Sequence, residues 1–259
     1  MSDDRRLRLA LVGYGRMGRA IEVAAAERGH QVTARIDPAA PGADRPAIPD
    51  DLADQADVAI EFTVPSAAPG NVRRLLELGI PTVSGTTGWT ERLGETRALA
   101  GQLGVGFLWA PNYALGVQLL FRLVGRAATW FGRLGGFDPW VFEAHHARKK
   151  DAPSGTAQQL AELIVAGTPG KERFGCAPDD APPPPDLVPV GWVRAGEIPG
   201  THRVGWDGPG ESIEIVHVAR DRGIFGRGAV RAAEWIVGRS GPATIAEMLD
   251  ELLAGKEEP

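Results

Sequence analysis

Residues 7–18 read LRLALVGYGRMG, a short apolar run that passes directly into a glycine-rich turn. The run has the length and composition of a buried strand, and the stretch 19–28 after the turn has a helical pattern that stops at Gly29. Between a strand and a helix, Gly13, Gly15 and Gly18 let the backbone approach a pyrophosphate, whose charge is met by amides at the start of the helix. The stretch predicts dinucleotide binding, and a purely structural turn is the alternative.

An acidic residue follows the next strand of the pattern, which spans 32–36 and ends on Asp37. A carboxylate at this place can hold the ribose hydroxyls of the adenosine half of a dinucleotide. It also repels a 2′-phosphate, so Asp37 favours NADH over NADPH. Arg16 and Arg35 are cations close by in sequence that offset part of this repulsion.

Strands and helices then alternate along the chain. Strands are expected at 58–62, 82–83 and 105–109, with helices at 67–78 and 91–103 between them. This order is typical of a doubly wound α/β fold with a parallel sheet. Ligands of such sheets lie beyond the carboxyl ends of the strands, where small and polar residues can line the cofactor. These residues are Thr63, Gly85, Thr86, Thr87, Ala110, Pro111, Asn112 and Tyr113, with helix capping and turn formation as the alternative role.

The rhythm changes after Asn112. Strands are expected at 140–145, 188–193 and 212–219, and a helix at 156–165. Seven of the 21 prolines lie between Pro169 and Pro189, which predicts a surface loop because proline donates no hydrogen bond to a helix or sheet. Helical patterns return at 228–237 and 244–253. The sequence therefore predicts a dinucleotide-binding domain of residues 1–112 plus 228–259, and an inserted α+β substrate domain with a mixed sheet at 113–227.

Residues 143–156, EAHHARKKDAPSGT, combine two adjacent histidines, three consecutive cations and a helix start. A histidine such as His145 titrates near neutrality and can deliver a proton, while a lysine and a helix N-terminus can hold carboxylates. A solvated cationic loop is the alternative. No metal site is expected, because no third ligand has a suitable spacing and the neighbours are cationic. Further along, the segment 194–203 adds Arg194 and His202, for which surface charge or subunit contacts are as plausible as substrate contact.

Composition excludes several classes of protein. The chain has 259 residues, a formal net charge of −5 and a single cysteine, so an internal disulfide is ruled out and a reducing compartment is favoured. The net charge argues against general nucleic-acid binding, and no apolar run approaches the roughly 20 residues that span a bilayer. We expect a cytoplasmic enzyme that acts on a small molecule, without nucleic-acid or membrane partners.

The motif EAHHARKKDAPSGTA, with GTTG upstream and GEIPGTH downstream, resembles the 4-hydroxy-tetrahydrodipicolinate reductase (dihydrodipicolinate reductase) family of lysine and diaminopimelate biosynthesis. The resemblance implies a Rossmann domain, an α/β substrate domain and a homotetramer assembled through the substrate-domain sheets. It also implies NAD(P)H-dependent reduction of a cyclic imine dicarboxylate. Related alternatives are another cyclic-imine reductase, an amine dehydrogenase or a catalytically silent nucleotide-sensing module.

The resemblance also implies roles for single residues. His145 matches the proton donor of the family and Lys149 its catalytic lysine, whereas the groups that hold the substrate carboxylates correspond to His146, Ser154, Gly155 and Thr156. The cofactor contacts correspond to Gly13, Tyr14, Gly15, Arg16, Met17, Gly18, Asp37, Thr63, Gly85, Thr86, Thr87, Ala110, Pro111, Asn112 and Tyr113. The glycine turn is one residue shorter than the GxxGxxG common in the family.

Overall fold

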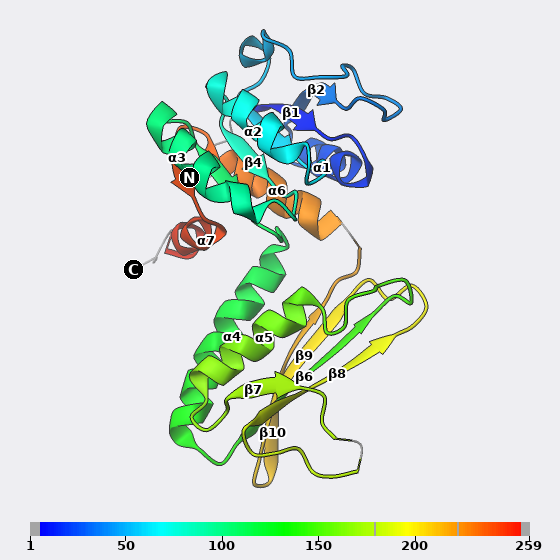
Figure 1. The fold of residues 1–259 in the computed structure, drawn as a ribbon, viewed down its shortest axis with the longest axis vertical. Coiled ribbons are helices and arrows are strands. Elements are labelled where there is room, and N and C mark those ends of the chain that lie inside the picture. The colour runs from blue at the N-terminus through cyan, green and yellow to red at the C-terminus, as the bar shows by residue number, and fades with distance from the viewer. Residues whose placement is uncertain (1–5, 179, 222, 255–259) are drawn as a thin grey trace. The chain divides into compact units, whose positions relative to one another are not determined.

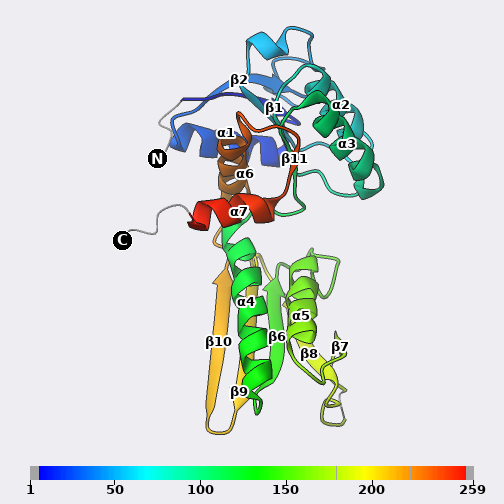
Figure 2. The ribbon, with the colours of Figure 1, turned by 90° about the vertical axis from the view of Figure 1, so that its left-hand side faces the viewer.

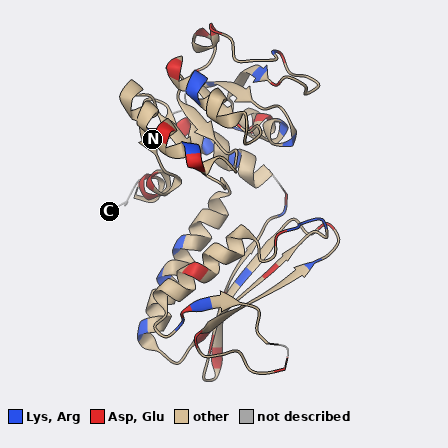
Figure 3. Cartoon of the chain, viewed as in Figure 1, with Lys and Arg blue, Asp and Glu red and all other residues tan. Residues whose placement is uncertain are grey.

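The computed structural model describes residues 6–178, 180–221 and 223–254, and the chain forms two compact units (Figure 1). Unit 1 comprises Met1–Ala114 and Gly223–Pro259, and unit 2 comprises Leu115–Arg222. Lys and Arg are interspersed with Asp and Glu over both units (Figure 3). Among the described residues, none of the helices combines the length and the apolarity needed to cross a membrane.

Unit 1 is built on a six-stranded sheet in which every paired strand is parallel. Apolar residues such as Leu9, Leu11 and Ile60 are fully buried in its central strands, as in sheets covered on both faces. In spatial order the strands are β2 (Gln31–Ile36), β1 (Arg8–Val12), β3 (Val58–Glu61), β4 (Thr82–Ser84), β5 (Phe107–Trp109) and β11 (Pro242–Ala243).

Helices lie on both faces of this sheet (Figure 2). The crossover from β1 to β2 runs in the opposite direction to the crossovers from β3 to β4 and from β4 to β5, so right-handed connections place their helices on opposite faces. One face carries α1 (Arg16–Glu27) and α6 (Gly223–Ile236), which contact each other. The other carries α2 (Ala68–Glu77) and α3 (Leu93–Leu103), and α7 (Ile245–Ala254) follows β11. Parallel strands and paired helices make unit 1 a Rossmann-type doubly wound fold.

Unit 2 has a mixed sheet of five strands. Its antiparallel pairs are β10 with β9 and β9 with β6, and its parallel pairs are β6 with β8 and β8 with β7. Two helices, α4 (Leu115–Leu134) and α5 (Gly155–Gly167), contact each other and pack on the sheet. The strands are β6 (Asp138–His145), β7 (Arg173–Gly175), β8 (Leu187–Arg194), β9 (Thr201–Gly208) and β10 (Glu211–Val218).

Burial alternates along β6, so that Val141, Glu143 and His145 are buried while Trp140 and Phe142 are only partly covered. The strand register pairs Glu143 with His202 of β9, and His202 with His217 of β10. Residues directly opposite on neighbouring strands share a face of the sheet. One face of unit 2 thus carries a row of titratable side chains.

Several elements differ from the sequence-based expectation. Helix α4 and strands β9 and β11 were not expected at all, and β7 lies inside the segment predicted to be only a surface loop. The prolines 182–185 do lie outside helices and strands, but Arg173–Gly175 pairs in parallel with β8, which the proline count concealed. Helices α1 and α6 begin earlier than expected, at Arg16 and Gly223.

Candidate functional site

A cavity of about 360 Å³ opens in unit 1 at the carboxyl ends of β1, β3 and β4. The first crossover leaves β1 toward β2, and the chain then continues on the other side of β1 at β3, so this is the switch point of the sheet. Open α/β sheets bind ligands at such switch points. The cavity is lined by Gly15, Arg16, Met17, Phe62, Thr63, Pro65, Gly85, Thr86 and Thr87.

Steric contacts require glycine at two positions of the glycine turn. Gly13 has φ +92°, and a Cβ there would lie 2.0 Å from the carbonyl oxygen of Phe62. A Cβ on Gly18 would lie 2.3 Å from the carbonyl oxygen of Gly13, so this glycine lets α1 approach the turn closely. Around Gly15 no atom lies within 4 Å of the Cβ position, and this N-cap provides no side-chain hydrogen bond to α1. The first amides of α1 therefore fit the phosphates of a dinucleotide.

Asp37 directly follows β2, as expected. Its Oδ1 accepts hydrogen bonds from the amides of Ala39 and Ala40 at 2.9 and 2.8 Å, and its Oδ2 accepts one from the amide of Tyr14 at 2.9 Å. The hydrogen bond from Ala39, with those from Tyr14 and Ala40, lowers the pKa of Asp37 against a smaller opposing effect of burial. The carboxylate is therefore ionised and lies at the glycine turn.

Arg35 does not offset the charge of Asp37 as the sequence suggested. Its guanidinium pairs with Glu22 and, at 3.2 Å, with Asp44. The Glu22 hydrogen bonds raise the pKa of Arg35 further above its usual value, so the cation stays committed to these acids. Arg16 is exposed at the cavity, where its charge can offset part of that of Asp37.

Glu61, at the end of β3, organises the other wall of the cavity. This fully buried carboxylate accepts hydrogen bonds from the hydroxyls of Thr63, Ser84 and Thr86, the last two at 2.6 and 2.8 Å. The hydroxyls of Thr63 and Thr86, which are expected to line the cofactor, thus already donate to Glu61. Thr87 is exposed beside them, and Gly85 seats the ring of Phe62, which a Cβ would approach to 2.1 Å.

The segment 110–113 contributes less side-chain chemistry than expected. Tyr113 is buried, and its hydroxyl donates to the carbonyl oxygens of Ser84 and Leu108 at 2.9 and 3.1 Å. Burial raises the pKa of this phenol well above its usual value. The Asn112 side chain accepts the amide of Ala114 at 2.9 Å, Ala110 is buried and Pro111 is exposed. Any cofactor contact by Tyr113 would therefore use its backbone.

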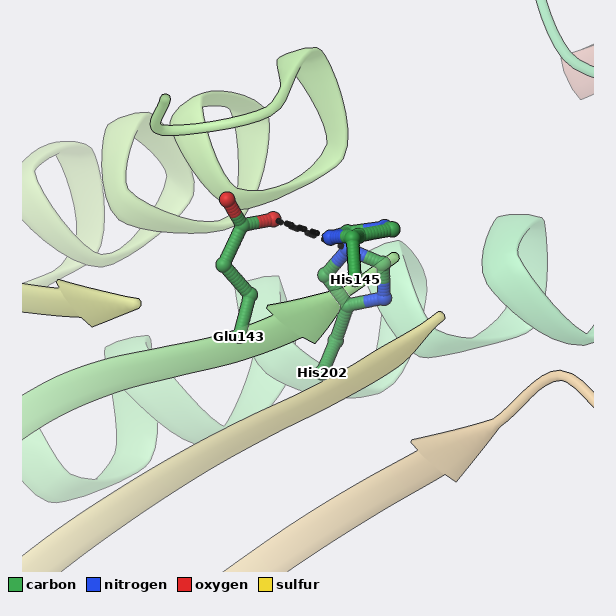
Figure 4. A group of neighbouring side chains, drawn as sticks. All are labelled: Glu143, His145 and His202. Atoms are coloured by element: carbon green, nitrogen blue, oxygen red, sulfur yellow. Dashed lines mark ion pairs between the residues drawn. The ribbon is translucent and has the colours of Figure 1, made fainter. Parts of the chain in front are cut away.

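Unit 2 holds a second cluster, in which Glu143 and His145 of β6 meet His202 of β9 (Figure 4). Glu143 Oε2 lies 3.3 Å from His145 Nδ1 and 3.5 Å from His202 Nε2. The two imidazole rings meet edge to face with their centroids 5.1 Å apart. All three side chains are buried, so a carboxylate and two imidazoles share one desolvated space.

Further donors surround this carboxylate. Glu143 Oε1 accepts the Ser154 amide at 2.8 Å and an Arg194 N–H at 2.6 Å, while Oε2 accepts the Ser154 hydroxyl. Burial would raise the pKa of Glu143, but hydrogen bonds from His145, His202, Ser154 and Arg194 hold it well below its usual range. Glu143 is therefore ionised in the interior.

The same three side chains bring potential ligand atoms within 4.8 Å of one another, which the motif spacing did not suggest because His202 comes from another strand. A guanidinium of Arg194 already balances Glu143, however, so the charge that would attract a divalent cation is largely compensated. The two imidazoles of the cluster are groups of a kind that can give or take a proton.

Lys149 and His146 lie in the loop after β6. Lys149 Nζ is 2.8 Å from both carboxylate oxygens of Asp151, which uses two of its three donors. Although burial opposes it, the hydrogen bond from Lys149 lowers the pKa of Asp151. His146 Nδ1 is buried without a hydrogen-bond partner in the described part of the chain. Lys149 thus keeps a donor for an anion, and His146 keeps an unpaired ring nitrogen.

A helix begins close to the predicted place, as α5. Ser154 is the N-cap, and its hydroxyl accepts the amide of Ala157 at 3.2 Å. No atom lies within 4 Å of the Cβ position of Gly155, so the approach to the first turn is open. The amides of Gly155 and Thr156 belong to the first helical turn, whose N–H groups have no partner within a helix. This N-terminus can receive a carboxylate.

The structure shows three functional candidates in unit 2 that the motif alone did not give. Glu143 is the common partner of His145, Ser154 and Arg194, and it stands in the motif as its first residue. The interpretation of His202 as surface charge is wrong, because the side chain is buried. Arg194 also reaches the carbonyl of Asp151 at 2.7 Å and thereby ties β8 to the lysine loop.

Two family models together match most of the chain. Residues 7–113 match the family described as "Dihydrodipicolinate reductase, N-terminus", and residues 116–252 match "Dihydrodipicolinate reductase, C-terminus". The two matches meet where the chain passes from unit 1 to unit 2.

Curated relatives carry one name. The 4-hydroxy-tetrahydrodipicolinate reductase of Christiangramia forsetii is 35% identical over 247 residues, which cover 95% of this chain and 99% of the relative. That of Alkalilimnicola ehrlichii is 39% identical and covers 90% and 94%. Among solved structures, a dipicolinate-bound dihydrodipicolinate reductase from Paenisporosarcina sp. TG-14 has a TM-score of 0.76 at 23% identity, covering 93% of this chain and 98% of that one. This last likeness concerns the fold.

Proposed function

The chain belongs to the dihydrodipicolinate reductase family, and we propose that it reduces 4-hydroxy-tetrahydrodipicolinate to tetrahydrodipicolinate in lysine and diaminopimelate biosynthesis. The observation that carries this proposal is the group of donors in unit 2. His145 adjoins Lys149, His146 and the open N-terminus of α5 on one strand-loop-helix segment. Such a segment suits a small cyclic dicarboxylate that must receive a proton.

A pyridine nucleotide held at the glycine turn and cavity of unit 1 would supply the hydride. The product lacks the 4-hydroxyl of the substrate, so this group must leave as water, which gives the unsaturated ring that takes up one hydride and one proton. We propose that His145 supplies the matching proton from its imidazole. Lys149, His146 and the amides of Gly155 and Thr156 bind the carboxylates and so orient the ring for both transfers. The nucleotide is proposed to lie on unit 1, at the glycine turn and the cavity beside it, and the substrate on unit 2.

The direct test of the function is reduction in solution. We expect the purified protein to oxidise NADH, followed at the nicotinamide absorbance, only when 4-hydroxy-tetrahydrodipicolinate is generated enzymatically in the same cuvette. Related cyclic imines, tested as substrates for reduction, and amino acids, tested for oxidation in the reverse direction, serve as the comparison. Tight nucleotide binding without turnover would indicate a silent nucleotide-sensing module instead, and preference for another imine would indicate a shifted substrate.

We propose that NADH binds more tightly than NADPH. The ionised Asp37 supports this preference, and so does the pairing of Arg35 with Glu22 and Asp44, which keeps that cation from a 2′-phosphate. Arg16 keeps the difference moderate.

Replacing Asp37 by asparagine should narrow the cofactor preference. The change removes a negative charge but keeps an acceptor for the amides of Ala39 and Ala40. A repulsion of about 1 kcal/mol between the Asp37 carboxylate and a 2′-phosphate corresponds to roughly fivefold in Kd. The change should therefore lower the Kd of NADPH by about this factor, while NADH loses a ribose contact. Calorimetric titration of both nucleotides measures it. Asp50→Asn is the charge-matched control, because Asp50 is an exposed partner of Arg74. A wild-type protein that prefers NADPH would contradict the assignment.

We also propose that unit 2 assembles the chain into a homotetramer through its sheet. Val193 of β8 and Val216 and Val218 of β10 are exposed by 42%, 50% and 58%, which supports burial of this sheet in an oligomer.

Val216→Lys should therefore shift the mass measured by sedimentation equilibrium from a tetramer to smaller species. A buried lysine without a counterion destabilises an apolar interface. Val23→Lys, a change of an equally exposed valine on α1 of unit 1, should leave the mass unchanged. A monomeric wild type would refute the assembly.

The single cysteine, Cys176, is exposed and lies in unit 2. A chain without disulfides suits a reducing compartment, and we propose the cytoplasm as its location.

A further inference from the structure

In unit 2, the fully buried Glu143 contacts the imidazole of the proposed proton donor, His145. We propose that Glu143 is a positioning residue that holds His145 with Nδ1 toward the carboxylate and Nε2 toward the substrate. The proposal rests on the proposed function, because it assigns a part in the proton transfer to a residue that touches neither ligand.

The negative charge of Glu143 decides which nitrogen of the neutral His145 imidazole carries the hydrogen. The carboxylate is ionised, and its oxygens accept hydrogen bonds from the Ser154 amide and from Arg194 at 2.8 and 2.6 Å. An ionised carboxylate only accepts, so the nitrogen that faces it must carry a hydrogen. His145 Nδ1 is buried and lies 3.3 Å from Oε2, an ion-pair distance, and it makes no hydrogen bond with any of the described residues. A bare nitrogen lone pair facing an ionised carboxylate at this distance would be repelled, whereas an N–H is attracted. The neutral imidazole of His145 therefore takes the Nδ1–H form.

The proton that His145 gives to the substrate comes from Nε2. When His145 is an imidazolium, both nitrogens carry hydrogens, and the one on Nε2 is free to transfer. After the transfer the imidazole is neutral with its hydrogen on Nδ1, still bound to Glu143. The proton leaves Nε2 and joins the substrate, while the carboxylate neither gains nor loses one. This is the same division of labour as in carboxylate-histidine pairs of hydrolases.

Access of the substrate to His145 Nε2 depends on the neighbouring Gly200. A Cβ built on Gly200 would lie 3.2 Å from His145 Nε2, and Gly200 has φ +149°, which a side chain rarely adopts. The space next to the donor atom is thus kept free by a glycine. Gly200 directly precedes β9, the strand that carries His202.

The other charged and titratable groups that face the pair come from three elements. His202 of β9 lies 3.5 Å from the same oxygen and 3.4 Å from Ser154 Oγ, and Arg194 of β8 holds the opposite oxygen. His217 of β10 lies behind His202 with ring centroids 6.3 Å apart, and burial lowers its pKa and favours its neutral form. His146 follows His145 in the loop. Glu143 is the acid of this group that touches His145 in the described structure.

Glu143 also explains why the proton donor and the carboxylate-binding turn hold a fixed relation. The same carboxylate accepts the amide and the hydroxyl of Ser154, the N-cap of α5. One buried anion thus connects β6, which carries His145, with the helix start that binds a substrate carboxylate.

The test is Glu143→Gln, which keeps an oxygen for the Ser154 amide and Arg194 but removes the charge beside Nδ1. We expect kcat to fall by about 10²–10⁴-fold. The alkaline limb of the kcat–pH profile should move to lower pH, because the imidazolium loses its counterion. NADH affinity should stay unchanged. Glu143→Asp keeps the charge and should recover part of kcat with the alkaline limb near its wild-type position. Asp186→Asn removes an ion-paired carboxylate elsewhere in unit 2, and it should leave kcat and the profile unchanged.

Two results would overturn the proposal. One is Glu143→Gln with wild-type kcat and profile, whether or not its unfolding temperature falls, since lower stability alone shows a structural role. The other comes from the wild type and needs no folded variant: ¹⁵N spectra of histidine-labelled protein should show neutral His145 in the Nδ1–H form, and the Nε2–H form would refute the assignment. Wild-type protein that fails to reduce the substrate would instead refute the proposed function, while the tautomer remains measurable.

Discussion

Replacing His145 by glutamine is expected to lower kcat by about 10²–10⁴-fold, the usual contribution of general acid catalysis. Glutamine fills a similar volume beside Glu143 and can donate a hydrogen bond, but it cannot supply a proton near neutral pH. Because the proposed nucleotide residues lie in unit 1 and His145 in unit 2, the Kd of NADH should stay within about twofold. Stopped-flow reduction and fluorescence titration of NADH measure the two quantities separately.

The internal control for this variant is its affinity for pyridine-2,6-dicarboxylate, an aromatic mimic of the substrate ring. Because Lys149 and the α5 amides remain in place, inhibitor binding should change little. A variant that retains wild-type kcat would show that His145 is not the proton donor. A parallel loss of inhibitor binding, nucleotide binding and unfolding temperature would indicate a disturbed fold.

The doubly wound part of the fold could be predicted because its signals are local. The glycine turn, Asp37 and the strand-helix alternation each involve neighbouring residues, and the structure has β1, α1 and β2 in the predicted order, with α1 beginning three residues earlier than expected. Helix α4 was missed although buried Val117, Leu120, Phe121 and Val124 recur at helical spacing. This helical spacing is visible in the sequence and is itself a signal for the helix. Strand β9 is harder to predict, because its glycines and charges resemble a loop and its strand form depends on pairing with β6 and β10.

The candidate site shows the same division. His145, Lys149 and the start of α5 lie within one short segment, so their proximity follows from the sequence. Glu143 gains its partners Arg194 and His202 from strands further along the chain, 51 and 59 residues away, and only the sheet register brings them together. Likewise, Glu61 accepts the hydroxyls of Ser84 and Thr86 across the β3–β4 pair, a role that neither motif nor composition indicates.

Lys149→Ala should reduce the affinity for pyridine-2,6-dicarboxylate by about 10- to 100-fold, because a charge-assisted hydrogen bond contributes about 1.5–3 kcal/mol. Two donors of the Lys149 ammonium already reach Asp151, so its third donor is the one available to a substrate carboxylate. Removing the lysine also leaves the charge of Asp151 uncompensated near the bound dianion, which increases the loss.

Lys150→Ala is the matched control for this prediction, since its side chain is exposed next to Lys149 in the same loop. It should change inhibitor affinity by less than about threefold, as expected for a screened surface charge. Thr156→Val should also cost less than Lys149→Ala, because it keeps the backbone amide at the start of α5. The monocarboxylate picolinate should bind much more weakly than the dicarboxylate, since it engages only one of the two carboxylate-binding groups. Equal inhibition by the two acids would show that Lys149, His146 and the α5 N-terminus do not together form a dianion site.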